Sequence, residues 1–298
     1  MAPLLSTTIR GSLVASLLVS SFCLTSAAIA AEVRVAVAAN FATPLKVLAS
    51  EFSKRTGHRV IPSSGATGKL YAQIKNGAPF EVLLAADDKV PAQLEAEGLT
   101  VPGSRFTYAN GKLVLFSAKP GLVDAQGAVL RTGQFTHLAI ANPKLAPYGA
   151  AAITVLTRLQ LLQATQSKFV QGENIAQTME FVVTGNAELG FVAWSQVLSD
   201  GKPRPGSYWM IPENLYPEIR QEAVILKPGA ENPAARAWCE FLKGEPARAT
   251  IAVLGYGLPR AAAEVAAASG NGAGSEPSPV KPSPAVKPTG TRSEKPVK

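Results

Sequence analysis

Residues 32–57 read EVRVAVAANFATPLKVLASEFSKRTG, and this stretch decides the fold class. The β-branched run at residues 33–37 predicts a buried strand. After a turn of small residues, apolar side chains recur at helical spacing over residues 45–52, and Gly57 ends the helical pattern. A strand, a turn and a helix of this length form the repeating unit of a parallel sheet covered by helices.

The same pattern recurs along the chain. Further strands are expected at residues 59–61, 81–85, 112–118, 138–141, 169–170, 189–193 and 223–226. Helices are expected at residues 67–77, 88–98, 147–162, 174–183, 232–242 and 246–254. The alternation predicts an α/β protein whose sheets are mainly parallel and carry helices on both faces.

The two ends of the chain have a different character. Arg10 precedes an apolar run at residues 11–24, and small residues follow at positions 28–31. This order predicts a signal peptide over residues 1–30 with cleavage near Ala30 or Ala31, and the run is shorter than the roughly 20 residues that span a bilayer. Residues 268–298 repeat Ser-Pro and Lys-Pro without an aromatic residue, which predicts a disordered tail.

Composition excludes several classes of protein. The 298 residues are 47% hydrophobic and 17% charged, which is enough apolar surface for a real core. Of the net charge of +8, the tail contributes three and Arg10 one, so the four that remain on residues 31–267 do not make a nucleic-acid-binding face. Cys23 lies in the leader, so Cys239 alone stays in the mature chain, and neither a disulfide nor a zinc cluster is expected.

Enzyme motifs are also missing from the sequence. It contains no Gly-x-Ser-x-Gly, and His58 and His137 are interpreted as surface or strand-end residues without a nucleophile beside them. Residues 65–70 superficially resemble a nucleotide-binding loop, but only two residues separate the glycines and Leu70 follows Lys69. We therefore expect neither an enzyme nor a metal site.

Four strand-to-helix turns carry small or hydroxyl residues, at positions 39–41, 64–68, 146–149 and 172–175. In open α/β sheets such turns lie at the carboxyl ends of strands, where helix N-termini present free N–H groups. Several of these ends meeting at one point form an anion site without a formal positive charge. Each turn on its own is better explained as a helix cap.

Five segments carry a family resemblance: VAVAANF at 35–41, GATGKLYAQIKNGAPF at 65–80, ANGKLVL at 109–115, IANP with APYG at 140–149, and ELGFVA at 188–193. Together they resemble the periplasmic molybdate-binding proteins of molybdate ABC importers. The resemblance runs from about Glu32 to Arg260 and does not include the leader or the tail.

The resemblance implies a two-lobed periplasmic binding protein of type II. Each lobe would be a mixed, mainly parallel sheet flanked by helices, with lobe I at residues 31–112 plus 213–262 and lobe II at residues 113–212. The oxyanion would lie in the cleft between the lobes. The protein would be a periplasmic monomer without a cofactor that delivers its anion to a membrane permease.

The resemblance also implies the binding residues, which are Ala39, Asn40, Ser64 and Thr67 from lobe I and Tyr148 and Ile175 from lobe II. Asn40 would donate from its side-chain amide and its backbone N–H, and Ile175 from its backbone N–H. Some family members place a tyrosine after the Gly-Phe-Val strand, where this chain has Ala193. That tyrosine contacts the anion, and in the branch that this sequence resembles the residue at the position of Tyr148 makes the contact instead.

These residue types suit molybdate, a tetrahedral dianion that carries no proton at neutral pH and therefore only accepts hydrogen bonds. A carboxylate is expected where a protonated phosphate must be recognised, and none of the six positions is acidic. Glu173, close to Ile175, is expected to point to solvent or to cap its helix. Tungstate, nearly the same size, is expected to bind as well, and a binding protein for sulfate or another small oxyanion is the alternative.

Two readings from other classes stay open at this point. An exported enzyme could use the same cleft, although no convergent histidine or paired carboxylates are seen. An adhesion or cell-wall protein could act through its Pro- and Lys-rich tail, with the binding domain as a passenger.

Overall fold

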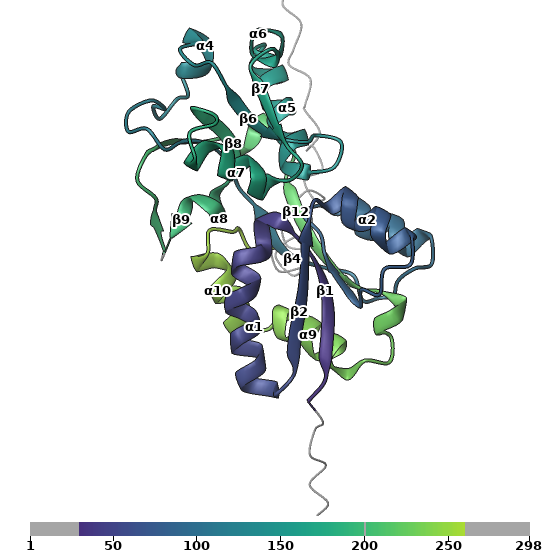
Figure 1. Cartoon of the computed structure of the whole chain (residues 1–298). Helices are drawn as coiled ribbons and strands as arrows, with labels where there is room; N and C mark the ends of the chain where they lie inside the picture. The colour runs from purple at the N-terminus through teal and green to yellow at the C-terminus, as the bar shows by residue number, and fades with distance from the viewer. Residues whose placement is uncertain (1–29, 200, 260–298) are drawn as a thin grey trace, which may run out of the picture.

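The computed structural model describes residues 30–199 and 201–259 (Figure 1). The predicted signal peptide and tail lie outside the described residues. Two five-stranded sheets and one short two-stranded sheet are present in the part described. No helix of residues 30–199 or 201–259 is both long and apolar enough to cross a membrane.

The first sheet has the strand order β2-β1-β3-β12-β4. Its strands are β1 Glu32–Ala38, β2 Arg59–Gly65, β3 Val82–Leu84, β4 Phe106–Gly111 and β12 Ile219–Ile225. The helices with it are α1 Ala42–Thr56, α2 Thr67–Lys75, α3 Lys89–Ala96, α9 Pro233–Lys243 and α10 Glu245–Val253, with short 3-10 turns η1 Ala39–Phe41 and η3 Lys227–Gly229. Phe41, Phe52 and Trp238 belong to the buried cluster between this sheet and its helices.

The second sheet has the order β11-β5-β8-β6-β7. Its strands are β5 Leu113–Ser117, β6 Leu138–Ala141, β7 Phe169–Gly172, β8 Leu189–Ala193 and β11 Ser207–Met210. The helices with it are α4 Val129–Thr132, α5 Pro147–Arg158, α6 Leu162–Gln166, α7 Ile175–Val183 and α8 Trp194–Val197. The small sheet joins β9 Leu198–Ser199 to β10 Lys202–Pro203, and η2 Glu213–Leu215 is a short 3-10 turn.

The chain passes between the sheets twice, from β4 through Lys112 to β5, and from β11 through residues 211–218 back to β12. In each sheet, four strands run in the same direction. The fifth, β5 in one sheet and β12 in the other, is the strand entered on crossing and runs antiparallel to both of its neighbours. The expectation of mixed, mainly parallel sheets is confirmed, and Figure 1 shows the two halves joined where β4 ends and β12 begins.

Several elements differ from the sequence prediction. The helix expected over residues 147–162 ends at Arg158, because Gln160 takes a left-handed conformation with φ of 60° and α6 then begins a new direction. This change brings Leu159 and Leu161 against the buried core. Strands β4 and β11 lack a long apolar run and were not predicted. His58 is at a strand end but buried, where its Nδ1 accepts a hydrogen bond from Ala31 N at 3.1 Å.

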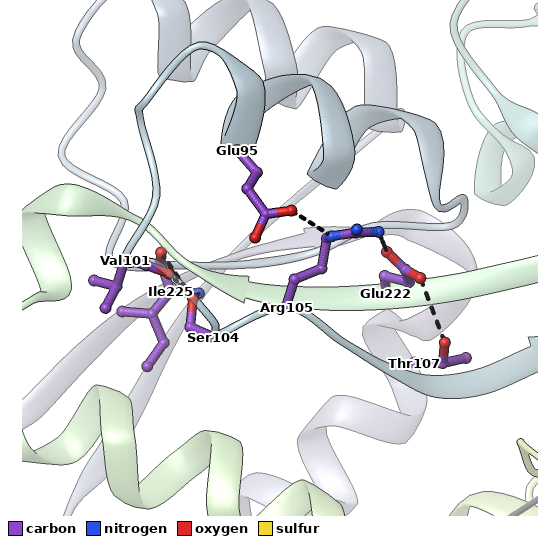
Figure 2. Close-up of polar contacts among 7 residues, drawn as sticks. All are labelled: Glu95, Val101, Ser104, Arg105, Thr107, Glu222 and Ile225. Atoms are coloured by element: carbon purple, nitrogen blue, oxygen red, sulfur yellow. Dashed lines mark hydrogen bonds and ion pairs between the residues drawn. The ribbon is translucent and has the colours of Figure 1, made fainter. Parts of the chain in front are cut away.

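A polar cluster holds β12 against β4 and α3 (Figure 2). Arg105 donates to Glu95 of α3 and to the buried Glu222 of β12, at 2.9 Å in each case. Thr107 of β4 donates to the same Glu222 carboxylate at 3.4 Å. A buried carboxylate is costly unless it is paired, so this cluster fixes the part of β12 that follows Gln221.

Candidate functional site

A small cavity lies between the two sheets. Residues from four helix starts line it: Ala38, Ala39, Asn40, Gly65, Ala66, Thr67, Ala86, Ala146, Pro147, Tyr148, Asn174 and Ile175. Apart from Ala86, which follows β3, they lie at or just before the starts of η1, α2, α5 and α7, so two of the four helix starts belong to each sheet. The structure therefore brings together the four turns that the sequence singles out.

A larger cleft shares Ala86, Ala146 and Pro147 with this cavity. Its lining includes acidic residues such as Asp87 and Glu218 as well as basic ones. The small cavity, by contrast, is lined by no Asp, Glu, Lys or Arg. Only the small cavity has the neutral lining expected of a site that holds an anion with dipoles.

The backbone N–H groups at the four helix starts are free to bind a ligand. Those of Asn40, Thr67, Tyr148 and Ile175 have no acceptor among the described residues. The first N–H groups of a helix have no partner within the helix, and the helix dipole makes them attractive to anions. Four such ends meeting at one cavity form an anion site.

Thr67 adds a hydroxyl donor to these backbone groups. Its side chain is buried, and Oγ1 accepts a hydrogen bond from Ala86 N at 3.0 Å. With that backbone N–H as its donor, the oxygen keeps its own hydrogen available. Thr67 follows Ala66, whose extended conformation starts α2 at this point.

Tyr148 supplies a second hydroxyl from the other sheet. It follows Pro147 at the start of α5, and its side chain is 1% exposed. Its hydroxyl oxygen accepts a hydrogen bond from Gln221 Nε2 at 3.1 Å, so its own hydrogen remains free to donate. Burial, reinforced by nearby Tyr256 and Tyr108, raises the pKa of Tyr148 well above its ordinary value, so the hydroxyl stays protonated at neutral pH.

Asn40 lines the cavity, but its side-chain amide has other partners. Nδ2 donates to Gln221 Oε1 at 2.9 Å and to the Tyr256 hydroxyl at 3.1 Å, while Oδ1 is buried with no partner in the described chain. The Tyr256 hydroxyl donates in turn to the Asn40 carbonyl at 2.8 Å. The backbone N–H of Asn40 is therefore free in the described part of the chain, whereas both hydrogens of its side-chain amide are used within the protein.

Ala39 and Ile175 line the cavity, whereas Ser64 does not. The Ile175 carbonyl accepts a hydrogen bond from Gln196 Nε2 at 3.1 Å, which holds the start of α7 in place. Ser64 is exposed near the end of β2, and the two residues that follow it, Gly65 and Ala66, reach the cavity instead. The side chains of a strand alternate between faces, so a shift of one position turns a residue away.

Glu173 is exposed to solvent, which is one of its two expected positions, and it also makes an ion pair that was not expected. Its carboxylate pairs with Lys69 Nζ of α2 at 2.6 Å, which joins the two halves of the molecule across the cleft. Asn174 caps α7, with Oδ1 accepting from Ala176 N and Gln177 N. Asn174 also lines the cavity, and a helix-capping asparagine in this turn is a sequence signal that could have identified it.

The cavity lining can donate hydrogen bonds but carries no formal charge. Thr67, Tyr148 and the starts of four helices line the cavity, and residues 30–199 and 201–259 hold no group of three or more His, Cys, Asp or Glu placed to bind a metal ion. Such a site suits a small anion that only accepts hydrogen bonds.

Comparison with known proteins decides the family. Residues 33–257 match the family of bacterial extracellular solute-binding proteins. The chain belongs to this family. One relative of this solute-binding protein, the molybdate-binding protein ModA of Azotobacter vinelandii, is 63% identical over 235 residues, or 79% of this chain and 93% of the relative. The ModA of Rhodobacter capsulatus is 50% identical over 249 residues, or 84% of this chain and 96% of that protein.

Solved structures agree with the family assignment. The periplasmic molybdate-binding protein of Azotobacter vinelandii superposes with a TM-score of 0.75 at 47% identity, covering 76% of this solute-binding protein and all of the solved chain. The sulfate-binding protein SubI of Mycobacterium tuberculosis has a TM-score of 0.65 at 12% identity, covering 80% of this chain and 91% of that one, and shows the common fold alone. The two-lobed binding-protein fold and the family resemblance expected from the sequence are confirmed.

Proposed function

We propose that this solute-binding protein captures molybdate outside the cytoplasmic membrane and delivers it to the membrane permease of an ABC importer. The observation that carries the proposal is the small neutral cavity at which four helix starts, Thr67 and Tyr148 meet. Relatives at 63% and 50% identity are named molybdate-binding proteins, which supports the same ligand here.

The donors are sufficient for tight binding. A hydrogen bond to a charged group contributes about 1.5 to 3 kcal/mol net. Five or more such bonds in a closed, dry cavity reach the roughly 8 to 12 kcal/mol of a micromolar to nanomolar site after the costs of association. The neutral lining removes the need to bury a lysine or arginine beside the ligand.

Ligand choice follows from the absence of an acceptor and from size. A protonated phosphate needs a partner for its hydroxyl, and the cavity lining offers no carboxylate. Sulfate has shorter bonds to oxygen, so donors placed for molybdate would be overstretched around it. Tungstate is nearly the same size as molybdate and is expected to bind.

The working cycle is capture by closure. The open form binds the anion on one lobe, the second lobe then closes over it, and the closed shape docks on the permease. Contacts across the cleft, such as Gly68 N donating to the Leu145 carbonyl at 2.9 Å, stabilise the closed form. Because the relatives are named as binding proteins, we assign binding and transport rather than catalysis to this chain, as a monomer in the periplasm.

The test is calorimetry of the mature chain, from residue 31 onward, with molybdate, tungstate, sulfate and phosphate in turn. We expect tight binding of molybdate and tungstate, and no displacement of bound molybdate by millimolar sulfate. Displacement by sulfate would reassign the protein as a binder of sulfate or of oxyanions in general. A matched chain without residues 269–298 should bind equally well, since an adhesion role of the tail would affect surface retention and not anion affinity.

A further inference from the structure

Gln221 is a fully buried polar residue that the sequence does not single out. It lies in β12, at the point where the pairing of β12 with β4 shifts register. Gln221 pairs with Ala109 and Glu222 pairs with Thr107, so Tyr108 of β4 is the extra residue of a bulge. A bulge redirects a side chain, and here the Tyr108 hydroxyl reaches Gln221.

Both ends of the Gln221 amide are engaged with residues of the site or its support. Oε1 accepts from Asn40 Nδ2 at 2.9 Å, and it shares the single Tyr108 hydroxyl hydrogen, at 3.1 Å, with the Ala85 carbonyl at 3.0 Å. These donors set the direction of the amide, so Nε2 faces Tyr148 and donates to its hydroxyl oxygen at 3.1 Å.

The hydrogen bond from Gln221 Nε2 limits the directions in which the Tyr148 hydroxyl hydrogen can point. A phenol oxygen that accepts from an amide nitrogen turns its own hydrogen elsewhere, and Tyr148 lines the cavity. Without the Gln221 donor, the buried hydroxyl could use its hydrogen to satisfy a protein acceptor instead. Gln221 does not line the cavity, so it acts on a ligand only through Tyr148 and Asn40.

The contact also joins the two halves of the molecule. Gln221 belongs to the first sheet, while Tyr148 starts the helix that follows β6 of the second. It fits only because position 111, at the crossing, is glycine. A Cβ there would lie 2.3 Å from the Tyr148 hydroxyl oxygen and 2.7 Å from Gln221 Nε2, closer than real contacts allow.

We propose that Gln221 is a positioning residue for anion binding: it orients the Tyr148 hydroxyl hydrogen toward the cavity, and it does so only when the two lobes are closed. The proposal rests on the proposed function, because it assigns a role in the same site.

The experiment is a double-mutant cycle read by calorimetry with molybdate. We expect Gln221→Met and Tyr148→Phe each to weaken binding about tenfold, because Tyr148→Phe removes a charge-assisted donor and Gln221→Met turns the same donor away from the ligand. The double variant should be no more than about threefold weaker than the weaker single variant, whereas independent sites would give about a hundredfold loss. Gln221→Glu keeps the acceptor for Asn40 but loses the donor when ionised, so it should bind at least as weakly as Gln221→Met.

Controls separate positioning from general damage. Gln73→Met, on the exposed face of α2, should bind like the parent chain, and the melting temperature without ligand checks each fold. If Gln221→Met does not fold, Gly111→Ala displaces the same contact without changing Gln221. It should weaken binding in the parent chain but not in a chain that already carries Tyr148→Phe. Additive losses, or unchanged affinity in the folded variants, would overturn the positioning role. A parent chain that does not bind molybdate would instead overturn the proposed function.

Discussion

At the scale of residues, the proposed site depends on hydroxyl groups. Each hydroxyl oxygen accepts a hydrogen bond from the protein, and its own hydrogen has no acceptor within the described part of the protein. Thr67 and Tyr148 each accept one hydrogen bond from the protein, which leaves one hydroxyl hydrogen for a ligand. Asn40 shows the opposite case, since its amide nitrogen is already bound to Gln221 and Tyr256. A hydroxyl that accepts from the protein keeps its hydrogen free, whereas an amide whose N–H groups are already bound does not.

Thr67→Val tests the proposed donation from the Thr67 hydroxyl. Valine keeps the shape of threonine and removes the hydroxyl, so molybdate binding should weaken at least about tenfold. Asn40→Ala should weaken binding to a similar extent, because the amide supports the helix start whose N–H faces the cavity. Calorimetry measures both, with Thr157→Val on the exposed face of α5 as the matched control. Unchanged affinity in both site variants would remove the two residues from the site.

At the scale of elements, helix starts of the two sheets are held face to face by contacts across the cleft. Lys69 of α2 pairs with Glu173 before α7, and Gly68 N donates to the Leu145 carbonyl before α5. The side chains of Lys69 and Glu173 are 49% and 46% exposed, so their ion pair is screened by water and contributes little to stability. Its effect is on the balance between open and closed forms.

Glu173→Gln should weaken molybdate binding about two- to fivefold at low ionic strength, the range of a surface ion pair. The difference from the parent chain should disappear at about 0.5 M salt, because exposed charges are screened there. Glu240→Gln breaks a comparable exposed pair within α9 and should leave affinity unchanged. A loss that persists in high salt would contradict an electrostatic latch and indicate a steric or structural role.

At the scale of the whole molecule, three buried tyrosines gather behind the cavity. Burial raises the pKa of Tyr108, Tyr148 and Tyr256 above the ordinary value of 10.0. In the unfolded chain these hydroxyls ionise near pH 10, while in the folded chain they keep their protons. The unfolded state therefore binds fewer protons above pH 10, and the stability is fully present below that pH and is lost above it.

We accordingly expect these tyrosines to cause little change in the free energy of unfolding with pH below about pH 9. Above about pH 10 the free energy of unfolding should fall by up to about 1.4 kcal/mol per pH unit for each tyrosine. Urea denaturation across this range measures the slope. Tyr256→Phe removes one of the three groups and should give a shallower fall. An equal slope in the variant would show that other groups cause the alkaline loss.

Much of the fold was predictable because its signals are local. Apolar strands such as β1, β6 and β8 and amphipathic helices such as α1 are visible in the sequence as periodic patterns. Strands β4 and β11 were not predicted, since their residues are only partly apolar and their pairing partners lie far away in the chain. The end of α5 depended on a left-handed Gln160, a conformation that no common turn signal marks.

The sequence by itself determined the family, the class of fold and the four turns at which helices begin. The tertiary structure alone decided which hydrogen-bond donors are used within the protein and which stay free. Asn40 meets Gln221 and Tyr256 across 181 and 216 residues of chain, and Tyr148 meets Gln221 across 73. A helix start follows from its own few residues, but the direction of a hydroxyl hydrogen follows from whichever acceptors and donors the folded chain places beside it.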